Sequence, residues 1–238
     1  FYHFMDVKTA KRAWNSEVSS IDTCLLLYGA ILAGQCFHGP TEVMANRLLN
    51  RVDWQWMLTR AGTQPKSLVL CHGWTPEKGF LSGNWDSYSE GVLLYILGMG
   101  VSKSPLPSRS WTAWKRKPFT FQGLTSLSDG PLFLHQMPHL FLDLRGKRDC
   151  TGYSFEISAL NAARSHIAFC RTNLTKRRTY AEGFWGINAS DGPKGYEAFG
   201  IPSPEDGTVC PTAVAASILA IPEEARKQLD KMDNLLQR

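Results

Sequence analysis

Apolar residues recur with helical spacing along much of this chain of 238 residues. Residues 20–37, SIDTCLLLYGAILAGQCF, are apolar on nearly every face, which predicts a helix that is buried on both sides. Residues 41–58 alternate apolar and charged positions, which predicts one amphipathic outer helix. A further apolar helix is expected to begin near Ser87 and to run through EGVLLYILGMG. Buried and amphipathic helices therefore alternate in the first half of the chain.

The second half continues with helical segments that are separated by irregular stretches rich in Gly and Pro. Helices are expected at residues 111–114, 135–144, 155–174, 211–219 and 222–236. Short strands or extended segments are expected at residues 67–70 and 119–124, and an irregular segment at 184–207. This alternation predicts an all-α fold of nested helical rings, an α/α toroid. A helical bundle is the alternative, although long loops rich in Gly and Trp are unusual in bundles.

Composition and charge exclude several classes of protein. Hydrophobic residues make up 43% of the chain and charged residues 20%, as in an ordinary globular domain. The net charge of +5 and the short basic runs at 115–117 and 176–178 do not predict nucleic-acid binding. None of the six cysteines forms a CxxC pair, which disfavours a zinc ribbon, and no segment is expected to insert into a membrane. The chain opens within the motif FYHFMD, so we expect a fragment of a larger protein.

Acidic residues stand at the entrances of the two most apolar helices. Glu17 and Asp22 lie in WNSEVSSID, and Asp86 and Glu90 lie in WDSYSEG. Glycoside hydrolysis needs two carboxyl groups, one as a proton donor and one as a base or nucleophile. In a toroid the starts of the inner helices can ring one mouth, so these carboxylates could converge there.

Helix capping is a competing explanation for most of the same acids. Ser19-x-x-Asp22 and Ser87-x-x-Glu90 both have the spacing of a capping box, and Asp86 has the side chain of an N-cap. Spacing alone favours capping over catalysis. Glu17 precedes the helix and is not explained by capping.

Aromatic residues form a second group of candidates, because flat aromatic rings pack against the C–H faces of sugars. They are concentrated in or beside irregular segments: Trp74, Trp85, Tyr88, Trp111, Trp114, Phe184 and Trp185. A carbohydrate cleft and plain packing are both compatible with them. His135 and His139 are four residues apart, but Pro138 lies between them and no HExxH glutamate is present, so neither a metal site nor a cofactor is expected.

An ordered series of motifs resembles the glucoamylase-like family of bacterial glycoside hydrolases. That family includes endo-β-1,2-glucanases and a domain of cyclic β-1,2-glucan synthases. The motifs are FYHFMD, NSEVSSIDTCLLLYGAI, VDWQWML, WDSYSEGVLLYILGMG, GPLFLHQMPHLFLDLRGKRD, WGINASDGP and DGTVCPTAVAAS. The resemblance covers residues 1–219 and implies one catalytic domain, an (α/α)6 toroid that would be incomplete in this chain, with long loops and a few short strands at one end.

The resemblance also implies roles for individual residues. Glu90 is expected to protonate the glycosidic oxygen, and Glu17 or Asp22, with Glu17 favoured, to act as base or nucleophile. Sugar-binding roles are expected for Trp85, Asp86, Tyr88, His135, Gln136, His139, Arg145, Asp149, Trp185 and Asp191.

The substrate implied is a β-linked glucan, most specifically β-1,2-glucan, and a periplasmic or secreted location goes with the resemblance. Two alternatives stay open at the level of sequence. One is a glycan-binding module without catalysis, and the other is a transglycosylating domain of a cyclic glucan synthase. The choice between inversion and retention is also open.

Overall fold

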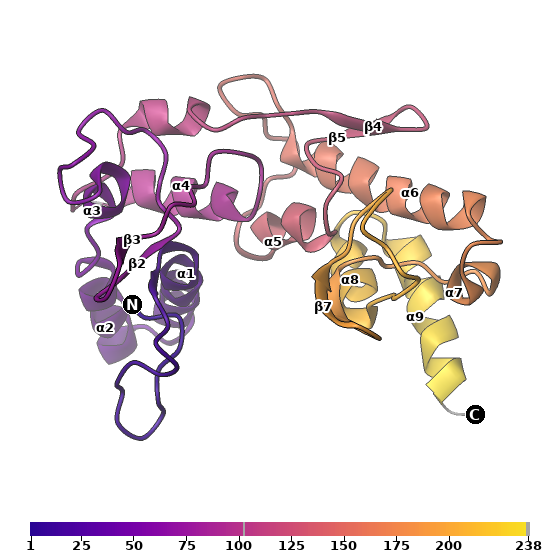
Figure 1. Cartoon of the computed structure of the whole chain (residues 1–238), viewed down its shortest axis with the longest axis horizontal. Helices are drawn as coiled ribbons and strands as arrows, with labels where there is room; N and C mark the ends of the chain where they lie inside the picture. Colours follow the sequence, from indigo (N-terminus) through magenta and orange to yellow (C-terminus); the bar gives the residue numbers. More distant parts are fainter. Residues whose placement is uncertain (102, 237–238) are drawn as a thin grey trace. The chain divides into compact units, whose positions relative to one another are not determined.

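A computed structural model of the chain describes residues 1–101 and 103–236. The fold is rich in α-helix and has a few short strands, and it divides into two compact units (Figure 1). Unit 1 comprises Phe1–Arg116 and unit 2 comprises Lys117–Arg238. Each unit is described by itself.

Unit 1 is built around helix α1 (Ser20–Phe37), which packs against α2 and α4 (Figure 1). The remaining helical elements of unit 1 are α2 (Gly39–Leu49), α3 (Trp54–Thr59), α4 (Gly91–Gly100) and the 3-10 helix η1 (Ser108–Thr112). The bounds predicted for α1 are confirmed. The prediction of one helix over 41–58 was wrong.

Two local signals divide that segment. Pro40 lies in the first turn of α2, where its fixed φ suits a helix and its missing N–H is not needed. Asp53 then starts α3, because its side chain accepts a hydrogen bond from the backbone N–H of Trp56 at 3.2 Å. The Gly39-Pro40 pair therefore forms the start of α2.

Helix α1 is less buried than its composition predicts. Its first half is buried at residues such as Cys24 and Leu27, whereas Leu32 and Phe37 in the second half are exposed. Burial on both sides was therefore a wrong expectation for unit 1, whose α2 and α4 cover only part of the helix. With 18 residues and a mean hydropathy of 1.4, α1 is also long and apolar enough to cross a membrane by length and composition alone. A core helix passes the same test.

A small antiparallel sheet precedes and supports α1. Its strands, in spatial order, are β1 (Val18–Ser19), β2 (Gly73–Thr75) and β3 (Gly79–Phe80). Val18 is paired with Trp74, and Ser19 with Gly73. The segment 67–70, predicted as a strand, contains none. The sheet fixes the entrance of α1, because β1 runs into the helix without an intervening loop.

Gly73 allows the close approach of β1 and β2. A Cβ atom added at this position would lie 2.6 Å from the carbonyl oxygen of Val18 and 2.9 Å from Cγ of Glu17. Gly73→Ala is therefore expected to destabilise the protein by about 2 kcal/mol in urea unfolding followed by circular dichroism. The matched control is Gly29→Ala in α1, where no atom lies within 4 Å of the new Cβ. The control should stabilise the helix by roughly 0.5 kcal/mol, and equal effects of the two changes would contradict the steric argument.

Unit 2 contains the remaining elements. They are β4 (Phe119–Phe121), β5 (Leu124–Ser126), α5 (Phe133–Phe141), α6 (Phe155–Thr172), α7 (Arg178–Ala181), β6 (Ala189–Gly192), β7 (Gly195–Ala198), α8 (Pro211–Ala216), η2 (Ser217–Leu219) and α9 (Pro222–Leu236). The predicted extended segment at 119–124 is confirmed as part of the β4–β5 hairpin, and α6 lies within two residues of its predicted end. The segment 184–207, expected to be irregular, holds the β6–β7 hairpin.

The core of unit 2 forms around α6. Ile167 and Phe169 of α6 pack with Tyr180, Ile187 and Val214, which come from loops and helices further along the chain. Ser154 begins α6 by accepting a hydrogen bond from the backbone N–H of Ile157, as an N-cap does.

Candidate active site

The junction of β1 and α1 carries two of the predicted acids. Glu17 directly precedes β1, and Asp22 lies in the first turn of α1. Ser19 is the N-cap, as predicted: its Oγ accepts a hydrogen bond from the backbone N–H of Asp22 at 3.1 Å and donates one to Asp22 Oδ2 at 2.6 Å. The backbone N–H of Ser19 donates to the carbonyl of Phe1, so the Asp22 carboxylate does not complete a reciprocal capping box.

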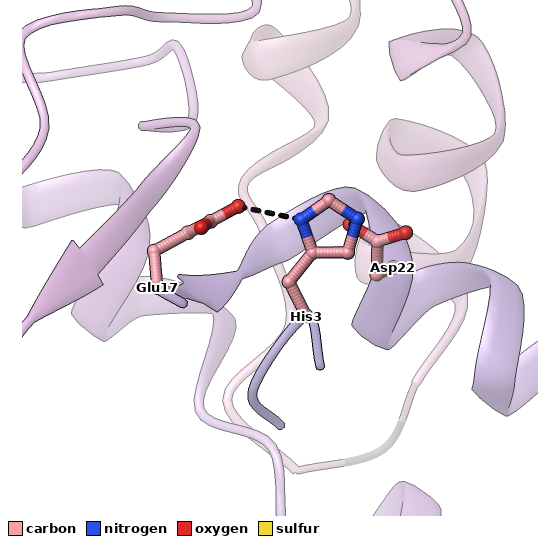
Figure 2. A group of neighbouring side chains, drawn as sticks. All are labelled: His3, Glu17 and Asp22. Atoms are coloured by element: carbon pink, nitrogen blue, oxygen red, sulfur yellow. Dashed lines mark hydrogen bonds and ion pairs between the residues drawn. The ribbon is translucent and has the colours of Figure 1, made fainter. Parts of the chain in front are cut away.

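His3 lies between the two acids (Figure 2). Its Nδ1 is 3.0 Å from Glu17 Oε1, and its Nε2 is 3.5 Å from Asp22 Oδ2. Only an imidazole ring that carries protons on both nitrogens can donate to both carboxylates. All three side chains keep access to solvent.

Their ligand atoms lie within 4.8 Å of one another, so among the described residues this trio could hold a cation. Exposed acidic groups of this kind are also common without one. The sequence prediction included the motif around His3 but gave the residue no role, because 14 positions separate it from Glu17 and no local spacing connects them.

Glu90 stands at the start of α4. It occupies the N-cap position, but its side chain makes no capping hydrogen bond, and Ser89 Oγ accepts from the backbone N–H of Gly91 instead. The predicted capping box of Ser87 and Glu90, and the N-cap role of Asp86, were wrong because α4 begins four residues later than expected. The carboxylate of Glu90 therefore serves no visible structural purpose in the described part of the chain.

The environment of Glu90 favours its protonated form. Burial raises the pKa of the Glu90 carboxyl, and the negative charge of Asp22 raises it further. Helices α1 and α4 pack against each other, and the charge of Asp22 contributes to the raised pKa of Glu90, so the acids at the two helix starts lie in one region. The sequence predicts that Glu17, Asp22, Asp86 and Glu90 converge at one mouth, and for the set of four this stays a prediction.

Three more predicted residues lie beside Glu90 in sequence, in different settings. Trp85 donates its indole N–H to Ser20 Oγ at 2.9 Å and remains partly exposed. The Asp86 carboxylate is 3.5 Å from the Lys115 ammonium group. Tyr88 is buried with its ring against Trp114. Trp85 is thus a partly exposed aromatic residue beside the start of α1.

Most of the aromatic candidates pack into the core of their own unit. Trp111 and Trp114 contact each other edge to face in unit 1, and the guanidinium of Arg116 lies 3.5 Å from the centre of the Trp114 ring. In unit 2, Phe184 and Trp185 are buried and line a cavity of about 300 Å³. Packing therefore explains these four rings, and Trp74 and Trp85 keep partly exposed faces.

The predicted residues of α5 are in polar contacts within unit 2. His135 is buried, its Nδ1 is 3.3 Å from Ser158 Oγ, and burial lowers the pKa of His135 to about 4. Gln136 donates from Nε2 to the carbonyl of Ala213 at 2.8 Å and so joins α5 to α8. His139 Nε2 is 3.4 Å from the carbonyl of Phe155.

Arg145 pairs with Asp143 at 2.8 Å. It lines a cavity of about 290 Å³ together with Gln136 and His139. Asp149 and Asp191 do not line this cavity. Asp149 Oδ1 accepts hydrogen bonds from the backbone of the turn that follows it, and Asp191 is exposed on β6. In unit 2, three of the seven predicted residues are therefore brought to one cavity.

Comparison with known proteins identifies the family. The model of the family described as "Putative glucoamylase" matches residues 82–238, about two thirds of the chain. A comparison with curated proteins finds no match.

Similar solved structures agree with this assignment. "Putative glucoamylase from Bacteroides uniformis ATCC 8492" is 25% identical with a TM-score of 0.84, over 96% of this chain and 59% of that one. A β-1,2-glucanase from Parabacteroides distasonis is 21% identical with a TM-score of 0.86, over 96% and 38%. An endo-β-1,2-glucanase from Chitinophaga pinensis is 21% identical with a TM-score of 0.74, over 91% and 55%.

The chain spans between 38% and 59% of the length of these three structures. The similarity to the two glucanases, at 21% identity, shows a shared fold. The match of the family model covers more than half of the chain. The chain therefore belongs to the glucoamylase family that this model describes.

Proposed function

We propose that this chain carries the acidic centre of a glycoside hydrolase that cleaves β-1,2-glucan, within an (α/α)6 toroid to which its helices contribute. Glu90 is the general acid that protonates the glycosidic oxygen. Glu17 or Asp22, with Glu17 favoured, acts on water or on the anomeric carbon. The observation that carries the proposal is the meeting of Glu17 and Asp22 at His3, 3.0 and 3.5 Å from its ring nitrogens, at the start of the helix that packs against α4. Glu90 begins α4, and the charge of Asp22 contributes to its raised pKa.

The two acidic positions differ in the way that acid–base catalysis needs. Glu90 is more buried, has no hydrogen-bond partner among the described residues, and has a raised pKa, so it can hold a proton for a leaving group. Glu17 and Asp22 face His3, whose ring can donate to them. Two carboxyl groups in contrasting environments are the arrangement that separates an acid from a base.

The choice of β-1,2-glucan is supported by the similar structures. Two of them are described as β-1,2-glucanases, and the chain covers at least 91% of its own length in each alignment. Membership of the glucoamylase family supports glycosidic bonds as the target. The centre needs no cofactor for this reaction, since protons and water are the only other reactants.

A panel of glucans tests the proposal. The protein is incubated with β-1,2-, β-1,3- and β-1,4-glucans and with starch, and the products are separated by chromatography. We expect reducing ends and short oligosaccharides from β-1,2-glucan alone. Release from starch alone would contradict the linkage. Cyclic or elongated products without new reducing ends would indicate transfer, and glucan binding without any product would indicate a binding module.

A further inference from the structure

The loop between His3 and Glu17 carries a tryptophan, Trp14, whose side chain is mostly exposed to solvent. Trp14 is 84% exposed and Phe4 is 43% exposed. The Trp14 ring contacts Phe4 edge to face, with ring centres 5.1 Å apart. Phe4 in turn stacks on His3, with ring centres 4.0 Å apart and planes inclined by 17°. A continuous row of rings thus leads from Trp14 to the residue that contacts Glu17 and Asp22.

Trp14 adds little to the packing of unit 1. An indole that stays mostly in water gains little from the hydrophobic effect, and its recorded ring contact is the edge of Phe4. Its backbone is also strained, because Trp14 has φ 50° and Asn15 has φ 54°. Left-handed backbone is unfavourable for a bulky residue and persists only where surrounding contacts impose it.

Arg12 imposes that conformation. Its guanidinium donates to the carbonyls of Asn15 and Ser16, both at 2.5 Å, and forms two hydrogen bonds with the carboxylate of Glu77 at 2.5 and 3.0 Å. A planar guanidinium that binds both oxygens of one carboxylate is a rigid anchor. The ion pair between Arg12 and Glu77 therefore holds the loop in the conformation that exposes the indole of Trp14.

The base of the loop is closed independently. Ser16 Oγ accepts from the backbone N–H of Phe4 at 3.2 Å and donates to its carbonyl at 3.1 Å, and the backbone N–H of Ala13 donates to the same carbonyl. Phe4 is thereby fixed against both His3 and Trp14. The row of rings has a defined geometry relative to the acids.

We infer that Trp14 and Phe4 form a sugar-binding platform that holds a glucose unit of the glucan next to the one cleaved, an inference that rests on the proposed function. The flat C–H face of a pyranose would lie on the indole, and the chain would pass along Phe4 toward His3, Glu17 and Asp22. Apolar walls with a few well-placed polar groups are typical of such sites. Neither residue was among those predicted from the sequence.

Binding without turnover tests the platform separately from catalysis. Titration calorimetry with a β-1,2-linked glucooligosaccharide is performed on Glu90→Gln as the parent protein. Adding Trp14→Ala is expected to weaken binding at least about tenfold, and adding Trp14→Phe should restore most of the affinity. The matched control is Phe37→Ala, since Phe37 is 76% exposed at the far end of α1 from Asp22 and should not affect binding.

Trp14→Gly distinguishes a ligand-binding role from a structural one. Glycine adopts φ near 50° without strain, so this change should raise the melting temperature by about 2 °C while it weakens binding as much as Trp14→Ala does. A residue kept for folding would show the opposite effect on stability. Unchanged affinity in both Trp14 variants would overturn the platform.

The outcomes separate the two proposals. Binding that depends on Trp14, in a protein that hydrolyses no glucan, would overturn the proposed function and leave Trp14 and Phe4 as a glucan-binding surface without a cleaved bond beside it. Hydrolysis of β-1,2-glucan by a protein whose affinity does not depend on Trp14 would keep the proposed function and overturn the platform. Absence of binding by the Glu90→Gln parent would overturn both.

Discussion

Glu90→Gln is expected to reduce kcat for β-1,2-glucan by about 10³-fold, because an amide has no acidic proton for the leaving oxygen. The side chain keeps its size, and no described hydrogen bond of Glu90 is lost. The melting temperature should therefore be unchanged or slightly higher, since a carboxyl that burial and Asp22 both disfavour as an anion has been replaced. Stopped assays of reducing ends, with calorimetry of unfolding, measure both quantities.

Glu42→Gln is the matched control, because Glu42 is exposed on α2. Its turnover should equal that of the wild type. Substrates with an activated leaving group provide a second check, since they need little protonation and should lose far less activity in Glu90→Gln. A variant that retained wild-type turnover on the polymer would remove Glu90 from the mechanism.

The dependence of kcat/KM on pH should also identify Glu90 as the general acid. Because the pKa of Glu90 is raised, the alkaline limb of kcat/KM should lie above the ordinary range of a glutamic acid. Asp22→Asn removes the negative charge that raises the pKa, so the limb measured on the residual activity should move to lower pH. A limb that stayed in place would show that Asp22 and Glu90 are not coupled.

Unit 2 is expected to lose about 4 kcal/mol of stability when the pH falls from 7.5 to 5. Burial lowers the pKa of His135 to about 4 and that of His166 to about 3, and the charges of His139 and His135, respectively, lower them further. Their unfolded values are close to 6.5, so below that pH the unfolded chain binds protons that the folded chain excludes. Each histidine therefore contributes about 2 kcal/mol of loss at pH 5, and the stability is fully present only above the unfolded pKa.

Urea unfolding at pH 7.5 and pH 5, followed by circular dichroism, measures this loss. His166→Gln should remove about half of the pH dependence, whatever its effect at neutral pH. His38→Gln is the control, since His38 is exposed and should leave the dependence intact. Hydrogen exchange of α6, which carries His166, assigns the loss to unit 2. Equal pH dependence in wild type and His166→Gln would rule out the buried histidine as its source.

The sequence predicts those features that neighbouring residues determine. The bounds of α1 follow from a continuous apolar pattern, and the N-cap at Ser19 follows from its spacing to Asp22. The positions of Asp22 and Glu90 at the entrances of two apolar helices predict that their charges interact, and the packing of α1 against α4 agrees with this. The pattern failed at Asp53, where amphipathic spacing continues across a helix boundary that a single side chain creates.

Features that depend on distant pairing were missed. Strand β1 has two residues and exists because it pairs with β2, more than 50 positions away. His3 acquires its place from the same folding of the N-terminal segment against Val18. Polar residues flank both Trp14, which is exposed, and Trp111, which is buried, so their neighbours in the sequence do not predict which ring faces solvent.

The hydrogen bonds between Ser16 and Phe4 close the loop, so the proposed sugar platform of Trp14 and Phe4 can change without moving Glu17 and Asp22. Glu17 and Asp22 belong to a strand–helix junction, whereas Trp14 belongs to a loop that is tied off before that junction begins. Insertions, deletions or exchanges between positions 5 and 15 would thus leave the acids where they are. Exchanging this loop for one of different sequence is therefore expected to change the affinity for longer oligosaccharides without displacing Glu17 or Asp22.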